Sequence, residues 1–550
     1  MKKFLFLFPS FFTTALFAQT PSWVWAQRAG GANTDYAYSV CSSSSGDVYS
    51  AGVFYSASIA FGSTTLTNLS TASADIFLVK YDASGNVLWA RAAGSAADDA
   101  ATSVATDASG NVYVTGWFSG ASIAFGSYTL VNASPGSGDI FLAKYDAAGN
   151  VLWAVRTGGA DWDLPQCVAA DQPGGDVYIT GGFSLSCTFA SSTVSSAGAI
   201  DAFLAKYDAS GNELWIRTAG GANNDLPNGI AIDALGRIYQ AGGFASASIT
   251  FGSSTLTNAG PGFPDIFFVK YDAAGNVIWA TREGGGDNDH AVWASRVVNG
   301  EVYITGHYHS ASFTVGSTTL NNSGMGDVFV MKYDTAGTVM WSKSHGGSDN
   351  DFAYSVLADA AGNAWACGMY MSAGVSFGPY SLTNAAAGNE DVFIAKYDSA
   401  GAVLWAGSYG GPGDDFANAI ALDPAGNLYA AGGFASAGIS FGPLTLTNAD
   451  NTGNTHDVFA AKLGLLTSAP AADGPDFSVY PNPSGALFSL RGARPGAKLS
   501  VHDPLGRCVW EGMAETQKHV LDLGPYAPGI YLLRIESQEG PVCLLRLIRR

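Results

Sequence analysis

The stretch KYDASGNVLWA at residues 80–90 decides the fold, because close copies of it return along most of the chain. The copies are KYDAAGNVLWA (144–154), KYDASGNELWI (206–216), KYDAAGNVIWA (270–280), KYDTAGTVMWS (332–342) and KYDSAGAVLWA (396–406). The tryptophans in these phrases, together with Trp25, lie 62 or 64 residues apart. A fixed period of this length indicates a repeat architecture.

Each copy of the repeat contains four strand-like runs. In the second copy these runs are ATSVATD (101–107), VYVTGWF (112–118), DIFLAKYD (139–146) and VLWAVRTGG (151–159). Alternating apolar residues bounded by Asp, Gly and Asn are typical of strands joined by hairpin turns. A unit of four antiparallel strands in seven copies predicts a β-propeller.

The two ends of the repeat region complement each other. Residues 23–31 (WVWAQRAGG) read as a lone fourth strand, and residues 457–463 (DVFAAKL) as a third strand with no fourth after it. We therefore expect the N-terminal strand to complete the last blade, which closes the ring and covers exposed sheet edges. The prediction is an all-β, seven-bladed β-propeller over residues 19–464, with about 63 residues per blade. Residues 22–464 resemble bacterial secreted β-propeller repeat proteins, a resemblance that implies a fold rather than an activity.

The N-terminus and the cysteines indicate export. Residues 1–18 (MKKFLFLFPSFFTTALFA) have two lysines before a short apolar run, which predicts a secretory signal peptide. No later apolar run is long enough to cross a bilayer, so we expect no transmembrane segment after its removal. Two cysteine pairs, Cys167 with Cys187 and Cys508 with Cys543, are either disulfides or free thiols, and their spacing leaves both readings open.

The charge of the chain argues against nucleic-acid binding. The 550 residues include 45 acidic and 26 basic side chains, for a net charge of −19, and such a chain does not attract phosphate. The repeat region has only four glutamates, Glu213, Glu283, Glu301 and Glu390, so its acids are nearly all aspartates. Aspartate bonds its own backbone in turns, and most of the negative charge is therefore a turn signature.

Sequence variation predicts which face of the propeller meets a partner. The turns between strands one and two and between strands three and four are short and uniform, whereas the segments of the opposite face vary in length. A protein or glycan ligand of unknown identity is expected on the variable face. On this face, the loops that join the fourth strand of one copy to the first strand of the next (the four–one loops) hold candidate ligands for a hard cation such as calcium. The alternative is that they are loop-capping aspartates exposed to water. These candidates are Asp35, Asp98, Asp99, Asp161, Asp163, Asp225, Asp287, Asp289, Asp349, Asp351, Asp414 and Asp415.

Two departures from the repeat suggest further sites. His307 and His309 are two residues apart on a strand and face one side, with His290 nearby, which could hold a transition metal or could be a polar patch. Trp162 and Phe263 are aromatic residues on the variable face. They could stack on sugar rings or cap the blade core.

The C-terminal segment has a different composition. Residues 465–475 read as a linker, and residues 476–550 alternate as a small β-sandwich should. This segment closely resembles the type A C-terminal sorting domain of type IX secretion substrates in Bacteroidetes. The matching motif residues are Tyr480, Pro481, Asn482, Pro483, Gly506, Arg507, Gly529, Ile530 and Tyr531. The resemblance implies passage across the outer membrane by the type IX machinery, with release or attachment to the cell surface.

The sequence favours a binding protein over an enzyme. It has no G-x-S-x-G, no H-E-x-x-H and no phosphate-binding glycine loop before a helix. We expect an exported binding or adhesion scaffold that requires no cofactor. The alternative is an extracellular glycan-active hydrolase or lyase that uses the carboxylates of the variable face. A purely structural surface component is a third interpretation.

Overall fold

The computed structural model describes most of the chain after the leader. The described ranges are 21–171, 175–190, 192–294, 300–450, 452–464, 478–480, 485–491, 495–502, 507–514, 516, 518–527, 529–536 and 543–549. The predicted signal peptide and linker lie outside them. The described residues form strands and turns without a helix, which confirms the all-β class. Ser22–Gly464 form one compact unit, and residues 465–550 belong to a second.

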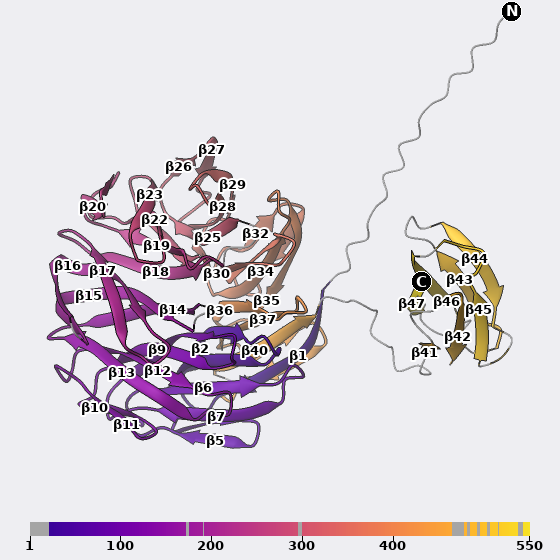
Figure 1. The fold of residues 1–550 in the computed structure, drawn as a ribbon, viewed down its shortest axis with the longest axis horizontal. Coiled ribbons are helices and arrows are strands. Elements are labelled where there is room, and N and C mark those ends of the chain that lie inside the picture. Colours follow the sequence, from indigo (N-terminus) through magenta and orange to yellow (C-terminus); the bar gives the residue numbers. More distant parts are fainter. Residues whose placement is uncertain are drawn as a thin grey trace, which may run out of the picture. The chain divides into compact units, whose positions relative to one another are not determined.

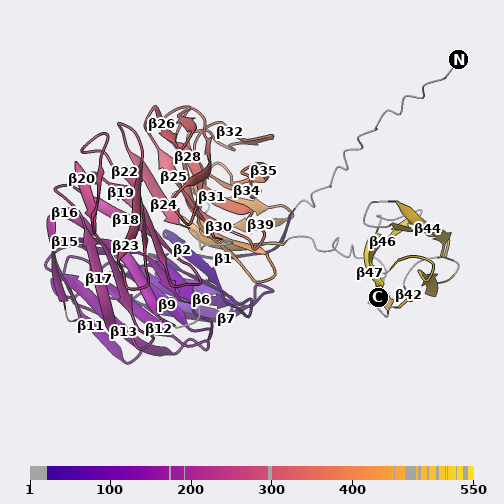
Figure 2. The same cartoon turned by 45° about the horizontal axis from the view of Figure 1, so that its top comes forward.

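Antiparallel sheets follow one another along the repeat unit (Figures 1 and 2). The first contains β2 (Asp35–Ser42), β3 (Val48–Phe54), β6 (Asp75–Tyr81) and β7 (Val87–Ala93). Three later sheets have the same order, namely β18 (Asp225–Ile232), β19 (Ile238–Phe244), β22 (Asp265–Tyr271) and β23 (Val277–Glu283); β24 (Asp289–Ala294), β25 (Glu301–Tyr308), β28 (Asp327–Asp334) and β29 (Val339–His345); β30 (Asp351–Ala358), β31 (Ala364–Tyr370), β34 (Asp391–Tyr397) and β35 (Val403–Tyr409).

The second and third copies join into one eight-stranded sheet. Its strands are β8 (Asp99–Thr106), β9 (Val112–Phe118), β12 (Asp139–Tyr145), β13 (Val151–Gly159), β14 (Asp163–Ala170), β15 (Val177–Phe189), β16 (Ser192–Tyr207) and β17 (Glu213–Ala219). In the third copy β15 and β16 run on into the segment that forms a separate short hairpin elsewhere, and Gly159 of β13 pairs with Cys187 of β15. The short hairpins of the other copies are β4 (Ser58–Phe61) with β5 (Thr64–Thr67), β10 (Ser122–Phe125) with β11 (Tyr128–Val131), β20 (Ser248–Phe251) with β21 (Ser254–Thr257), β26 (Ser312–Val315) with β27 (Thr318–Asn321), β32 (Gly374–Phe377) with β33 (Tyr380–Thr383), and β38 (Gly438–Phe441) with β39 (Leu444–Thr447).

The last sheet of the repeat unit combines both ends of its sequence. It contains β36 (Asp415–Leu422), β37 (Leu428–Phe434), β40 (Asp457–Gly464) and the N-terminal β1 (Ser22–Ala29). β1 pairs antiparallel with β40, from Ser22 opposite Gly464 to Ala29 opposite Val458. The N-terminal strand thus occupies the fourth position that the last copy lacks (Figure 1).

The repeated phrase forms the hairpin between the third and fourth strands. In the first copy Oδ1 of Asp82 accepts hydrogen bonds from the backbone nitrogens of Ser84 and Asn86, at 2.8 and 2.9 Å. Gly85 has a φ of +86°, a left-handed conformation that glycine adopts without steric cost. The Asp–Gly–Asn pattern of the phrase therefore specifies the turn directly.

The lysine and tryptophan of the phrase bind the next copy of the repeat at five junctions. Lys80 Nζ and Trp89 Nε1 both donate to the backbone oxygen of Ala147, in the three–four turn of the second copy, at 3.1 Å each. Lys462 Nζ and Trp25 Nε1 donate in the same way to the oxygen of Ala83, at 3.0 and 3.2 Å. The two residues that make the repeat visible in the sequence are therefore contacts between sheets.

The loss of stability caused by Gly85→Ala, compared with that caused by Gly46→Ala, tests how closely the first copy packs against Trp25. A Cβ at Gly85 would lie 2.7 Å from Cδ2 of Trp25, whereas a Cβ at Gly46, which has the same φ of +86°, meets nothing within 4 Å. Gly46→Ala should cost about 1–2 kcal/mol for the left-handed backbone. Gly85→Ala should cost about 1–3 kcal/mol more because of overpacking. Urea unfolding of both variants checks this difference, and equal losses would contradict the close contact.

The C-terminal unit consists of two small sheets around one apolar core. One sheet contains β41 (Ser478–Tyr480), β42 (Leu487–Arg491) and β45 (Lys518–Asp522). The other contains β43 (Lys498–His502), β44 (Cys508–Met513), β46 (Gly529–Glu536) and β47 (Cys543–Arg549). Phe488, Leu499, Leu521 and Leu533 are fully buried between them. Among the residues that the structure describes, no helix has the length and apolarity to cross a membrane.

Candidate functional site

The variable face of the repeat unit, called the loop face from here on, is the end at which the first strand of each copy begins. Seven of the predicted cation ligands are the first residues of these strands. All seven are fully buried rather than exposed to water. Asp35 shows why: its carboxylate accepts hydrogen bonds from Ser56 Oγ at 2.6 Å, Ser56 N at 3.0 Å and Gly31 N at 2.9 Å. These N–H and O–H donors hold the strand start at Asp35 in place, and they occupy its carboxylate oxygens. The seven are Asp35, Asp99, Asp163, Asp225, Asp289, Asp351 and Asp415.

The remaining five predicted cation ligands are exposed or half-buried. They are Asp98, Asp161, Asp287, Asp349 and Asp414. Each accepts at least one backbone N–H; for example, Asp98 Oδ1 binds the nitrogen of Ala74 at 2.9 Å, and Asp414 Oδ1 binds that of Glu390 at 3.1 Å. Over the described ranges, no three His, Cys, Asp or Glu side chains are grouped to hold a metal ion. Calcium binding at the loop face therefore stays a prediction from the sequence.

The structure brings the three predicted histidine ligands together as packed rings. His290 lies opposite His307 across β24 and β25, with ring centroids 5.6 Å apart, and His309 is also 5.6 Å from His307. His307 stacks on Phe352 at 4.0 Å. Burial lowers the pKa of His290 to about 4 and holds the pKa of His307 well below its usual value, so both rings are neutral at pH 7. The described histidines form part of no three-residue metal group, and a transition-metal site remains unsupported by the geometry.

The two predicted stacking residues are both partly exposed. Trp162 is 38% exposed and packs edge-on against Trp117, with ring centroids 5.2 Å apart. Phe263 is 48% exposed in the segment before β22. Trp162 thus covers a neighbouring aromatic and still presents part of its ring to solvent, so sugar stacking at these two residues remains a prediction.

A cluster that the sequence analysis missed lies where the last sheet meets the first. We call Tyr36, Glu390, Asp414, Phe416 and His456 the Glu390 cluster. Its three rings are in contact, with centroids 5.8 Å apart for Tyr36 and Phe416 and 5.1 Å apart for Phe416 and His456. The backbone nitrogen of Glu390 donates to Asp414, whose charge also acts on His456. Aromatic rings and carboxylates of three copies therefore meet at one place on the loop face.

Glu390 is one of the loop-face acids whose pKa is raised by burial and by neighbouring negative charge. Desolvation, together with the charges of Asp414 and Asp415, raises the pKa of Glu390 to about 7. Burial lowers the pKa of His456, so this ring is neutral at pH 7 and compensates no carboxylate charge. Burial and Glu390 also raise the pKa of Tyr354 on the neighbouring β30. A titratable, half-buried carboxyl with a raised pKa is a typical feature of a binding or catalytic site.

A position-by-position comparison of the copies could have found this cluster. Glu390 and His456 stand directly before the aspartate that begins the third strand. The other copies have small or apolar residues there, namely Ala74, Gly138, Ile200, Pro264 and Gly326. The exchange of an apolar for a titratable side chain was therefore visible in the sequence, although the contacts with Tyr36 and Phe416 required the pairing of the first and last copies.

Two small cavities lie between neighbouring sheets of the repeat unit. One of about 240 Å³ is lined by Arg217, Phe251 and Tyr271, and one of about 250 Å³ is lined by the equivalent Arg91, Phe125 and Tyr145. Both guanidinium groups donate to backbone oxygens of the next copy; Arg217 Nε, for example, binds the oxygen of Gly275 at 2.8 Å. These arginines therefore connect sheets.

The cysteines of the repeat unit are free thiols. Cys167 and Cys187 are both buried, and they belong to two different apolar clusters. Cys508 is exposed and free as well. The side chain of Cys543 lies outside the described residues, so the two readings of the pair Cys508 with Cys543 stay predictions from the sequence.

The predicted sorting motif is described in part. Positions 481–483 and 506 lie outside the described ranges, as do the side chains at 480, 529 and 530. Arg507 is exposed. Tyr531 in β46 is buried, and its hydroxyl donates to the oxygen of Ala527 at 2.6 Å. The described part of the motif thus contains a buried tyrosine, Tyr531, and an exposed arginine, Arg507.

Comparison with known proteins identifies the C-terminal segment. Residues 478–548 match the family described as "Secretion system C-terminal sorting domain". The match covers nearly all of β41–β47 and ends one residue before the last described position.

The repeat region resembles parts of larger proteins. The chain is 25% identical over 348 residues to "Regulatory protein FlaEY" of Caulobacter vibrioides, covering 60% of this chain and 36% of the relative. It is 25% identical over 443 residues to "Uncharacterized WD repeat-containing protein L264" of Acanthamoeba polyphaga mimivirus, covering 67% and 32%. The chain thus spans about a third of the length of these relatives.

The solved structures that match this chain are distant from it in sequence. Sqt1 from Chaetomium thermophilum has 9% identity and a TM-score of 0.37, over 86% of this chain and 96% of that one. PorZ, a surface component of the type IX secretion system of Porphyromonas gingivalis, has 11% identity and a TM-score of 0.19, over 94% and 82%. Likeness at this level says nothing about function.

Proposed function

Because residues 478–548 are a sorting domain of the type IX secretion system, which sends proteins to the cell surface or the extracellular space, we propose that the repeat unit acts there as a non-enzymatic binding scaffold. The type IX machinery is the partner that handles the chain during export. The ligand is a protein or a glycan that contacts the loop face. The scaffold needs no cofactor for this role.

The proposed scaffold is a closed, seven-bladed propeller. In this reading the eight-stranded sheet is two blades joined at their edges by β13 and β15. Contacts between the last and the first sheet support closure: Asn418 Nδ2 donates to the oxygen of Ala37 at 2.9 Å, and Trp25 and Lys462 donate to the oxygen of Ala83. A closed ring protects its sheet edges and holds loops from different copies at fixed distances.

The observation that carries the proposal is the contrast between the two faces. The opposite face is built from the same Asp–Gly–Asn turns in most copies, and its lysines and tryptophans already contact the next sheet. The loop face instead carries the Glu390 cluster, which occurs in one sector only. Unique side chains on a rigid repeat scaffold are where recognition is expected.

A glycan-active enzyme is the second candidate, favoured by one observation. The raised pKa of Glu390, about 7, suits a general acid at neutral pH, and Asp414 supplies a second carboxylate beside it. In this reading Glu390 protonates the leaving oxygen of a glycoside, and Asp414 acts as the base or nucleophile.

One experiment separates the two functions. The mature chain is screened against glycan and host-protein arrays, with and without calcium, and bound glycans are then analysed for cleavage products. The scaffold proposal predicts binding without turnover, independent of calcium. Product release that disappears in Glu390→Gln would support the enzyme instead, and absence of binding to either array would contradict the scaffold.

A further inference from the structure

Pairs of buried aspartates lie at the loop face wherever the third strand of one copy faces the first strand of the next. We call each of these seven places a junction. In each junction the aspartate that begins a third strand interacts electrostatically with the aspartate that begins a first strand of the neighbouring copy. The pairs are Asp457 with Asp35, Asp75 with Asp99, Asp139 with Asp163, Asp201 with Asp225, Asp265 with Asp289, Asp327 with Asp351, and Asp391 with Asp415. All fourteen side chains are at most 4% exposed.

The third-strand aspartate has one engaged and one unengaged oxygen in every junction. Its Oδ2 accepts a backbone N–H from the preceding segment; Asp75, for example, binds the nitrogen of Leu69 at 2.8 Å. Its Oδ1 is buried and makes no hydrogen bond within the described part of the chain. The seven are Asp75, Asp139, Asp201, Asp265, Asp327, Asp391 and Asp457. A buried, unpaired carboxylate oxygen is costly, so its repetition requires an explanation.

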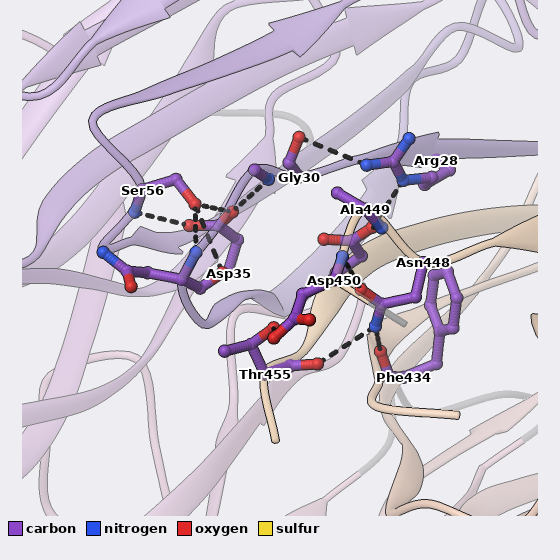
Figure 3. A network of polar contacts seen from close by, with 12 residues as sticks. Arg28, Gly30, Asp35, Ser56, Phe434, Asn448, Ala449, Asp450 and Thr455 are labelled. Atoms are coloured by element: carbon purple, nitrogen blue, oxygen red, sulfur yellow. Dashed lines mark hydrogen bonds and ion pairs between the residues drawn. The ribbon is translucent and has the colours of Figure 1, made fainter. Parts of the chain in front are cut away.

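Arginine compensates the charge in three of the seven junctions. Arg28, Arg156 and Arg282 bind Oδ2 of Asp457, Asp139 and Asp265, at 2.5, 2.6 and 2.7 Å. Figure 3 shows the first of these junctions, with Arg28 beside Ala449 and with Asp35 held by Ser56. The other four junctions have a residue without positive charge where these arginines stand, namely Ala92, Thr218, Ser344 and Ser408.

An arginine-free junction holds two buried carboxyl groups without a cation. Two buried carboxyl groups that repel each other electrostatically cannot both ionise cheaply, so we expect one of them to take up a proton or a metal ion. In the Asp75–Asp99 junction, the close packing favours a proton over a metal ion. Oδ1 of Asp75 packs so closely against Gly94 that a Cβ added to this glycine would lie 2.1 Å from the oxygen. A proton needs no additional volume, and the surrounding donors are N–H and O–H groups rather than the oxygen ligands of a cation.

We propose that each of the four arginine-free junctions holds one proton at mildly acidic pH, so that the contacts between these sheets weaken as the pH rises through neutrality. At the Asp75–Asp99 junction, burial raises the pKa of Asp75 to about 6 and that of Asp99 to about 7, from 3.8. The folded state therefore binds the proton of Asp75 roughly a hundredfold more tightly than the unfolded chain does. The other titratable groups near this junction are Asp98 and Tyr55, which supply no positive charge.

The sign of the pH effect follows from the raised pKa values. The folded state binds more protons than the unfolded state between pH 4 and about 7. The stabilisation is therefore complete below about pH 4 and is lost as the pH rises through 6 to 7. Asp163 should also make the repeat unit less stable as the pH rises, because burial and Asp139 raise the pKa of Asp163 to about 8. This holds although Arg156 binds Asp139 in the same junction.

The test uses two isosteric substitutions in the mature full-length chain. Asp75→Asn replaces a protonated carboxyl by a neutral amide of the same shape, at a junction without arginine. Asp265→Asn is the matched control, because it makes the same change where Arg282 is bound. The melting temperature is measured between pH 5 and pH 8 by tryptophan fluorescence, which reports on the repeat unit because Trp510 alone among the 13 tryptophans lies outside it.

The proposal predicts that the wild-type melting temperature falls by several degrees from pH 5 to pH 8. Asp75→Asn should be at least as stable as the wild type at pH 8, with a smaller dependence on pH, whereas Asp265→Asn should be less stable at every pH. A wild-type melting temperature that stays level or rises with pH, or equal losses in the two variants, would overturn the proposal. Stabilisation of the wild type by calcium at pH 8 that is absent in Asp75→Asn would also overturn it, in favour of a metal ion.

Discussion

Replacement of Trp25 by alanine is expected to lower the free energy of unfolding of the repeat unit by about 3–5 kcal/mol, as for other buried tryptophans. Trp25 comes from the N-terminal strand, is 7% exposed, and packs between Tyr81 of the first copy and Tyr429 of the last, with ring centroids 5.8 Å away on both sides. It also donates to the oxygen of Ala83. The substitution therefore removes a contact that holds the last sheet to the first.

Trp89→Ala is the matched control for this prediction. Trp89 is 8% exposed and makes the equivalent hydrogen bond to Ala147, but it connects two copies that are consecutive in the chain. In a closed ring the two substitutions should cost similar amounts in urea unfolding. If Trp25→Ala is nearly neutral while Trp89→Ala is strongly destabilising, β1 does not close the ring and the proposed propeller is open.

Deletion of residues 478–548 is expected to abolish delivery of the chain to the cell surface and the medium. The type IX machinery recognises the sorting domain, and the repeat unit has its own core and should fold without this domain. The truncated chain should therefore accumulate, folded, in the periplasm. Cell fractionation and protease treatment of intact cells measure where it resides.

A transplant provides the control for the deletion. Residues 465–550 attached to an unrelated periplasmic reporter should bring that reporter to the surface or the medium. Wild-type amounts of the truncated chain outside the cell, or failure of the transplanted segment to export the reporter, would refute the sorting role of these residues.

Much of the fold could be predicted because the repeated residues act locally. Asp82, Gly85 and Asn86 form a turn within five positions, so their return at a fixed period marks the third and fourth strands of each copy. The joining of the second and third copies was not predicted, because it depends on β15 and β16 running past the usual turn. Hydrophobic patterns specify strands more reliably than they specify where a strand ends.

The candidate site was harder to predict than the fold. The aspartates of the four–one loops look alike in sequence, yet Asp35 is fully buried under Ser56 whereas Asp98 is exposed. The difference depends on a serine that lies 21 residues after Asp35 and on contacts between sheets. Glutamate is a rare residue type in the repeat region, but the raised pKa of Glu390 arises from its burial and from Asp414 and Asp415 of the next copy.

We propose that recognition occurs on the loop face, in the sector of the Glu390 cluster. The most direct test measures the affinity of the ligand found by the array screen for three forms of the mature chain. Asp414→Asn alters the exposed acid of the cluster, and Leu235→Ser alters an exposed residue on the opposite face. We expect Asp414→Asn to weaken binding by at least about tenfold, or about 1.4 kcal/mol, while Leu235→Ser binds like the wild type. Unchanged binding by Asp414→Asn together with a loss in Leu235→Ser would contradict it.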